Sequence, residues 1–161
     1  KISILIVIFL ALWIKVKTQN YSFELDNKLS DLKALNQHLI DFGRDIGLPE
    51  LIISEINVCL DELFTNIVFY GFKDDRVHKI KFTIKVDDTM LIATMEDDGV
   101  PFNPLKKKAA ELPTDIDSAQ IGGLGIHITR ELMDTINYER KRGINRVTIK
   151  KSIQADGDAS A

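Results

Sequence analysis

Two consecutive stretches of alternating residues constrain the fold more than any other feature of this sequence. In residues 78–88, HKIKFTIKVDD, apolar side chains occupy every second position, the period of a strand with one buried and one solvated face: Ile80, Phe82, Ile84 and Val86. Residues 89–99 predict a second strand, separated from the first by a short turn at Asp87 and Asp88. Because short turns join antiparallel neighbours, the chain is expected to build a sheet whose apolar face is covered by other elements.

Two predicted helices supply this cover. Apolar residues recur at helical spacing from Lys28 to Ile46, which predicts a first helix. A second predicted helix begins at Pro49, a residue suited to helix starts, and ends at Gly71, a residue suited to helix ends. A strand in residues 20–26 precedes both helices.

The C-terminal half adds a long loop, a third helix and two strands. Residues 103–121 show no clear periodicity, residues 124–133 predict a helix, and residues 135–142 and 145–153 predict strands joined by a turn at Gly143 and Ile144. The predicted fold is an α+β two-layer sandwich with a mixed, mostly antiparallel sheet and three main helices on one face. Long loops inside compact domains are uncommon and usually functional.

Composition limits the class of protein. A chain of 161 residues, 45% hydrophobic and 28% charged, fits one globular domain. Its net charge of −3 offers no basic footprint for direct nucleic-acid binding. The single cysteine, Cys59, excludes an internal disulfide framework, fits a reducing compartment such as the cytoplasm, and is expected to pack in the core.

The N-terminus is expected to form a separate segment. Residues 2–14 are apolar except for Ser3, and lysines flank them, whereas a membrane-spanning helix needs roughly 20 apolar residues. Three interpretations stay open: a signal-peptide core, the end of a membrane anchor, or a segment that packs on this domain or on a second copy. The expected organisation is an apolar segment in 1–19, a globular domain in 20–153 and a frayed tail in 154–161.

The second predicted helix carries two polar residues on one flank. Glu62 and Asn66 are four residues apart, so their side chains share one side of the helix, bordered by Val58, Cys59 and Phe69. Such pairs usually lie on a wet helix surface, but the apolar neighbours favour a partly dry setting. A proton-accepting carboxylate beside an amide oxygen that can bind a hard cation suits metal-nucleotide chemistry.

A second motif ends the second central strand. In residues 96–104, EDDGVPFNP, acidic residues before a glycine would most often make only a turn. Asp97 at a strand end can also accept a hydrogen bond from an exocyclic amine, and Gly99 would let a flat ring approach the backbone.

A glycine cluster opens the third predicted helix. In residues 120–136, QIGGLGIHITRELMDTI, Gly122, Gly123 and Gly125 stand where the first helical N–H groups and the positive end of the helix dipole favour a phosphate. The spacing matches neither a Walker A loop nor the G-x-G-x-x-G dinucleotide pattern. Each of the three motifs is weak when taken alone.

Taken together and in this order, the three motifs resemble those of the GHKL (Bergerat-fold, histidine-kinase-like) ATPases. The resemblance covers residues 21–153 and is strongest to the branch of anti-sigma-factor serine/threonine kinases. It is carried by the stretches DELFTNIVFYGF, DDGVPFNP, GGLGIHITRELMD and NRVTIKK.

The resemblance implies ATP and Mg²⁺ as cofactors and a role for each motif residue. Glu62 would be the general base, Asn66 the Mg²⁺ ligand, and Asp97 the acceptor of the adenine amino group, with Gly99 giving the ring room. The other implied ATP-binding positions are Phe102, Gly122, Gly123, Leu124, Gly125 and Thr148.

The resemblance also implies a function. It points to a cytoplasmic kinase that regulates transcription by transferring the γ-phosphoryl group of ATP to a serine or threonine of a STAS-type anti-sigma antagonist. A sigma factor is a second implied partner and a homodimer the implied assembly, with membrane contact only if the N-terminal segment is a true anchor.

Two alternatives remain. Kinases of this branch commonly place a basic residue just before the glycines, where this chain has Ala119, Gln120 and Ile121; this favours a nucleotide-dependent partner switch with little kinase activity. The other alternative is the ATP-binding domain of a sensor histidine kinase. It is disfavoured because residues 28–46 predict one helix rather than a hairpin that carries a phospho-accepting histidine.

Overall fold

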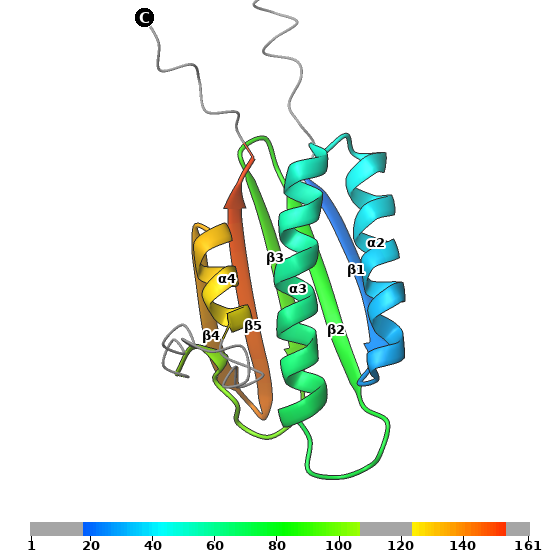
Figure 1. Ribbon diagram of the computed structural model, residues 1–161, viewed down its shortest axis with the longest axis vertical. Coiled ribbons are helices and arrows are strands. Elements are labelled where there is room, and N and C mark those ends of the chain that lie inside the picture. Colours follow the sequence, from blue (N-terminus) through cyan, green and yellow to red (C-terminus); the bar gives the residue numbers. More distant parts are fainter. Residues whose placement is uncertain (1–17, 107–123, 154–161) are drawn as a thin grey trace, which may run out of the picture.

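The computed structural model describes residues 18–106 and 124–153, which fold into two layers (Figure 1). One layer is a five-stranded sheet, and three helices cover one of its faces. In chain order the elements are β1 (Gln19–Asp26), the 3-10 turn η1 (Leu29–Asp31), α2 (Leu32–Asp45), α3 (Glu50–Tyr70), β2 (Lys79–Val86), β3 (Met90–Asp97), the 3-10 turn η2 (Pro104–Lys106), α4 (Leu124–Leu132), β4 (Thr135–Lys141) and β5 (Ile144–Ser152). The predicted α+β sandwich is confirmed.

The order of strands in the sheet is β1-β2-β3-β5-β4, and each strand runs antiparallel to its neighbours. The sheet is therefore antiparallel where a mixed one was expected. The last of the described strands, β5, lies between β3 and β4. Its register sets Asn145 opposite Asp97 of β3 on one side and opposite Arg140 of β4 on the other.

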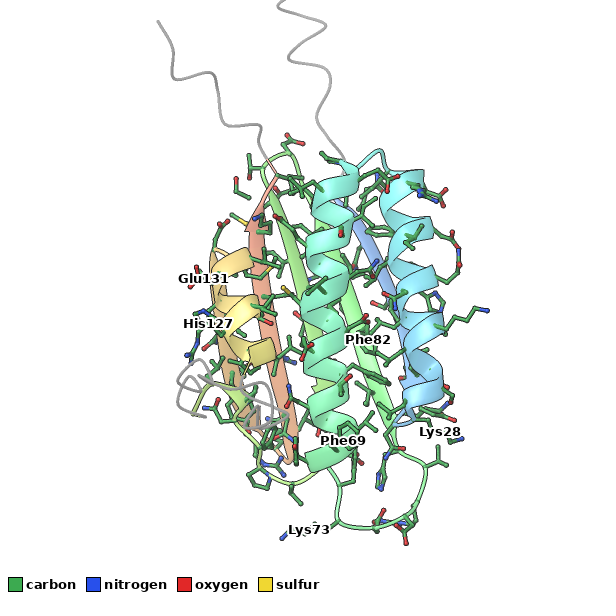
Figure 2. All side chains as sticks on the ribbon, viewed as in Figure 1. Lys28, Phe69, Lys73, Phe82, His127 and Glu131 are labelled. Atoms are coloured by element: carbon green, nitrogen blue, oxygen red, sulfur yellow. The ribbon has the colours of Figure 1, made fainter. Side chains whose placement is uncertain are left out.

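The core lies between the sheet and the three helices, with the largest share of helix residues from α3. The apolar residues at every second position of β2 point to the helices, and the ring centroid of Phe82, labelled beside α3 in Figure 2, lies 6.0 Å from that of Phe64 on α3. One stripe of α3 packs against them: Ile53, Ile56, Leu60, Leu63, Phe64 and Ile67. The other face of the sheet carries lysines, threonines and ion pairs such as that of Arg146 with Glu96 and Glu139, because none of the described helices covers it.

The β4–β5 hairpin turns at Arg142 and Gly143, whose φ angles are 53° and 86°. Positive φ at both central residues is the signature of a type I′ turn, whose twist matches the flanking strands. The sequence placed this turn at Gly143 and Ile144, which was wrong by one residue, because Ile144 already pairs with Lys141 in the ladder. Since side chains alternate between the faces of a strand, the position of this turn decides which residues of β5 point toward the helices.

One lysine near the end of β5 links three elements. The ammonium group of Lys151 lies 2.9 Å from a carboxylate oxygen of Glu55 on α3 and donates to the carbonyl of Leu132 at the end of α4 (2.8 Å). A cation is favourable at a helix C-terminus, so this contact complements the dipole of α4 as well as neutralising Glu55.

The helices within the described residues include none that is long and apolar enough to cross a lipid bilayer. The apolar N-terminal residues 2–14 and the tail after 153 lie outside the described part of the chain.

Candidate functional site

The helix motif, the strand-end motif and the start of α4 come together at one end of the molecule. The C-terminal half of α3, the end of β3 and the N-terminus of α4 lie at the lower end in Figure 1. A backbone hydrogen bond from the N–H of Val100 to the carbonyl of Gly71 (2.7 Å) joins the strand-end motif to the end of α3.

Gly99 lies directly against Gly71. A Cβ atom built on Gly99 would overlap the carbonyl oxygen of Gly71 and would stand 2.9 Å from its carbon, closer than real Cβ atoms approach backbone. The structure therefore gives a packing reason for glycine at position 99. Its predicted role, giving room to an adenine ring, stays a prediction.

Glu62 and Asn66 lie on adjacent turns of α3, as their spacing predicted. The Asn66 side chain is buried, and its amide nitrogen donates to the backbone carbonyl of Glu62 (2.7 Å). That bond fixes the orientation of the amide, because its nitrogen faces the helix backbone and its oxygen is the end left for a cation.

Glu62 also contacts the start of α4. A Cβ atom on Gly125 would overlap the carboxylate of Glu62 and would lie 2.8 Å from its Cγ. The first turn of α4 therefore lies on the Glu62 side chain, and any larger residue at position 125 would require that side chain to move. The predicted proton acceptor and the last glycine of the predicted phosphate-binding cluster are thus in contact.

Asp97 is a buried carboxylate at the end of β3, only 5% exposed. Its Oδ1 accepts hydrogen bonds from the N–H of Gly99 (2.8 Å) and from the side-chain amide of Asn145 (2.7 Å). Burial raises the pKa of this carboxyl group above its usual value, and the bonds from Asn145 and Gly99 oppose that rise. Both described donors use Oδ1, so Oδ2 is the oxygen available to a ligand.

Sequence reasoning missed Asn145, which is 2% exposed and central to this network. Its amide nitrogen also donates to the carbonyl of Val100 (2.9 Å), and its oxygen accepts from the hydroxyl of Tyr138 (2.8 Å) and the guanidinium of Arg140 (2.6 Å). The available signal was alternation: Asn145 shares a strand face with the buried Val147 and Ile149, where a polar residue requires a partner.

Thr148 does not join this group. It alternates with buried neighbours and lies on the face of β5 away from the helices, with its hydroxyl 3.4 Å from that of Thr94. Asp97 and Asn145 point to the helical face instead. The sequence prediction that the Thr148 hydroxyl helps to hold adenine does not fit this placement, because Thr148 and Asp97 lie on opposite faces of the sheet.

The remaining predicted positions are placed only in part. Phe102 stacks on Tyr70, with ring centroids 5.8 Å apart, beside the end of α3. Leu124 is the first residue of α4. Gly122 and Gly123 lie outside the described residues, as does most of the long loop.

The three histidines take no part in the site. His127 is exposed on α4 (Figure 2), His38 lies 2.6 Å from the hydroxyl of Tyr21, and His78 lies 2.7 Å from Asp74. Residues 18–106 and 124–153 hold no cluster of three His, Cys, Asp or Glu side chains suited to a metal ion. A Mg²⁺ ion held mainly by nucleotide phosphates needs only one or two protein oxygens, and Asn66 can supply one.

A charged cavity of about 310 Å³ lies elsewhere, on the open face of the sheet. Its lining includes Glu139, Lys141 and Arg146, which point away from the helices. It is separate from Asp97, Asn66 and Glu62, so it does not belong to the candidate site.

This chain is similar in sequence to two proteins named as protein kinases and to one named as an anti-sigma factor. Serine/threonine-protein kinase BtrW of Bordetella bronchiseptica is 28% identical over 94 residues, which cover 58% of this chain and 66% of the relative. Serine-protein kinase RsbW of Bacillus thuringiensis is 29% identical over 108 residues (65% and 66%), and anti-sigma F factor of Bacillus subtilis is 22% identical over 87 residues (54% and 60%). The matched parts thus span about two thirds of these relatives or less.

Solved structures share the fold. The RsbU and RsbW domains of Rv1364c from Mycobacterium tuberculosis align over 83% of this chain and 32% of that chain, with a TM-score of 0.60 and 16% identity. The histidine kinase domain of the blue-light activated kinase EL346 from Erythrobacter litoralis aligns over 76% and 61%, with a TM-score of 0.50 and 20% identity. At these identities the likeness concerns the fold alone.

The family match covers most of the described chain. Residues 25–151 match the histidine kinase-like ATPase domain, a range that includes the helix motif, the strand-end motif, the glycine cluster and β5. This chain belongs to the histidine kinase-like ATPase family.

Proposed function

We propose that this protein is a Mg²⁺-dependent, ATP-using serine/threonine protein kinase of the anti-sigma-factor type. Its substrate would be a serine or threonine of a STAS-type antagonist protein, and a sigma factor would be a second partner. Relatives named as a serine/threonine-protein kinase, a serine-protein kinase and an anti-sigma factor support this choice within the family.

The contact between Glu62 and Gly125 carries the proposal. It supports the proposal because the Glu62 carboxylate, the proposed base, lies against the N-terminus of α4, where backbone N–H groups and the helix dipole attract phosphate oxygens. Asn66, one turn along α3, bonds the Glu62 carbonyl with its amide nitrogen, which leaves its amide oxygen for the proposed Mg²⁺. A base, a cation ligand and a phosphate cradle are the parts that phosphoryl transfer requires.

The adenine end of the proposed site fits the chemistry of Asp97. A buried carboxylate with one oxygen saturated by two donors can accept a hydrogen bond from an exocyclic amine with the other oxygen. The residues present therefore fit an adenine nucleotide, with the base at Asp97 and the phosphates toward Gly125.

Each residue then has a defined task. Bound Mg²⁺-ATP would supply the γ-phosphoryl group and neutralise the charge of the phosphates. Glu62 would accept the proton of the substrate hydroxyl. The hydroxyl oxygen would bond to the γ-phosphorus as the bond between that phosphorus and ADP breaks. Asn66 would hold Mg²⁺, and Asp97 would fix the base, so that most of the rate enhancement comes from positioning.

Calorimetric titration with ATP, with and without Mg²⁺, tests the proposal directly. The wild-type protein should bind ATP, Asp97→Asn should abolish binding, and Asn66→Ala should remove the dependence on Mg²⁺. Transfer of labelled phosphate to STAS-type proteins then tests the reaction. A wild-type protein that binds no adenine nucleotide would overturn the proposal.

A partner switch with little kinase activity is the second candidate, favoured by the absence of a basic residue at positions 119–121. Glu62→Gln separates the two, because it removes the base and keeps the size of the side chain. A kinase would lose turnover and keep ATP binding. A switch would show no turnover in the wild type and nucleotide-dependent partner binding in both proteins.

A further inference from the structure

The side-chain amide of Asn145 is fixed at both ends. Its nitrogen donates to Asp97 and to the carbonyl of Val100, and its oxygen accepts from Tyr138 and Arg140. All four partners lie within 2.9 Å of the amide, in a residue that is almost fully buried.

The two donors on β4 decide which way this amide faces. An asparagine side chain can turn over and exchange its nitrogen and oxygen, which would set its oxygen against the carboxylate of Asp97. In that orientation two donors, the Tyr138 hydroxyl and the Arg140 guanidinium, would face the amide nitrogen. The pair on β4 therefore holds the donor end of Asn145 toward Asp97.

Arg140 acts on the second donor as well. The same guanidinium nitrogen that bonds Asn145 also donates to the carbonyl of Gly99 (2.9 Å). Gly99 and Asn145 are the two residues whose N–H groups bond Oδ1 of Asp97. One side chain from the edge strand thus braces both donors of the buried carboxylate.

We propose that Arg140, with Tyr138, is a positioning residue that sets the preference of the site for adenine over guanine by keeping Oδ2 of an ionised Asp97 aimed at the base. This inference rests on the proposed ATP site. Adenine presents an amino group where guanine presents a carbonyl oxygen. An ionised carboxylate accepts from the amino group and repels the carbonyl, whereas a protonated carboxyl group would tolerate guanine.

The charges around Asp97 act in the expected directions. Burial and the neighbouring Asp98 raise the pKa of Asp97, and Asn145, Gly99 and Arg140 lower it. Removing Arg140 should therefore raise this pKa further and extend the protonated form toward neutral pH. Discrimination between the bases should then fail at a higher pH than in the wild type.

The test measures the dissociation constants of ATP and GTP for the full chain from about pH 5.5 to about pH 8. Arg140→Met removes the hydrogen bonds to Asn145 and Gly99 together with the positive charge, whereas Arg140→Lys keeps the charge and removes the planar guanidinium. Tyr138→Phe removes one donor and leaves every charge in place. The matched control is Lys141→Met, which removes the adjacent positive charge on the outer face of β4.

Arg140→Met should lower the ATP-over-GTP preference roughly 10-fold, the order expected for a lost hydrogen bond that involves a charged group. The pH below which the preference is lost, its acid limb, should also move to a higher value. Arg140→Lys should recover part of the preference, Tyr138→Phe should lower it by a smaller factor without moving the acid limb, and Lys141→Met should leave it unchanged.

Two results would overturn the inference. One is an unchanged ATP-to-GTP ratio in both Arg140→Met and Tyr138→Phe while the wild type binds ATP, which would leave the proposed function standing. The other is a wild type that binds no ATP, which would remove the proposed function together with the inference. If Arg140→Met does not fold, the ratio in Tyr138→Phe decides.

Discussion

Asp97 is a carboxylate that the fold buries although burial disfavours its charge. Its Oδ1 is satisfied by Gly99 and Asn145, yet its pKa is raised, so the charged form is costly in the folded protein. Buried charged residues that lower stability and are held by several hydrogen-bond donors are typical of functional sites.

The first prediction separates stability from binding at this position. Asp97→Asn keeps an oxygen that can accept both bonds and removes the buried charge, so the variant should lose ATP binding but unfold at the same temperature as the wild type or higher at pH 7. The wild-type protein binds more protons when folded between the ordinary carboxyl pKa and the raised one, so its stability rises as pH falls through this window. The advantage of the variant should accordingly shrink toward acid pH in thermal scans. An advantage that grows toward acid pH would contradict this account.

The second prediction concerns the contact of Gly125 with Glu62. Gly125→Ala places a methyl group on the Glu62 carboxylate, so it should lower the free energy of unfolding by about 1–3 kcal/mol and weaken ATP binding. Urea denaturation of Gly125→Ala, Glu62→Ala and the double variant forms a cycle. Because Glu62→Ala vacates the space, the double variant should recover most of the lost stability. Simple additivity of the two losses would show that the contact is not the cause.

At the scale of elements, the sequence predicted regular segments well and their connections less well. Strict alternation in β2 is compatible only with a strand, and the apolar stripe of α3 only with a helix, so the ends of both elements were predicted to within a residue or two. The β4–β5 turn was misplaced because Arg142 adopts a positive φ, which arginine rarely does and which the sequence therefore does not predict. Asn145 was missed because its partners come from two other strands.

The third prediction uses this turn. A left-handed backbone costs a residue other than glycine about 1–2 kcal/mol, and asparagine followed by glycine is preferred in type I′ turns. Arg142→Asn should therefore raise the free energy of unfolding by about 1 kcal/mol, seen as a higher urea midpoint with an unchanged slope. Lys141→Asn, within the strand, should give no gain. Destabilisation by Arg142→Asn would contradict the assigned turn.

At the scale of the whole molecule, three elements meet at Lys151. Its side chain joins β5 to Glu55 of α3 and to the end of α4 at Leu132, so it links the sheet to both helices that border the candidate site. Sequence reasoning could place these three elements in order but could not pair Glu55 with Lys151, because nearly a hundred residues of chain separate them.

The fourth prediction tests this link. Lys151→Met leaves the mostly buried Glu55 without its cation, so it should lower the free energy of unfolding by about 1–3 kcal/mol. Lys150→Met, on the exposed face of the same strand, is the matched control and should change it by less than about 0.5 kcal/mol. In chemical denaturation, Glu55→Gln combined with Lys151→Met should restore part of the loss. Equal effects of the two lysine variants would show that the link is not what matters.

The position of β5 in the sheet has a consequence for biosynthesis. This strand follows β4 in the chain and is the last of the described strands, yet it fills the gap between β3 and β4 and delivers Asn145 to Asp97. A nascent chain that has not yet emerged from the ribosome through β5 therefore has the proposed base and cation ligand on α3 but no completed adenine end. Because a ligand stabilises only the state that binds it, ATP would favour the finished fold and leave an interrupted chain exposed to proteolysis.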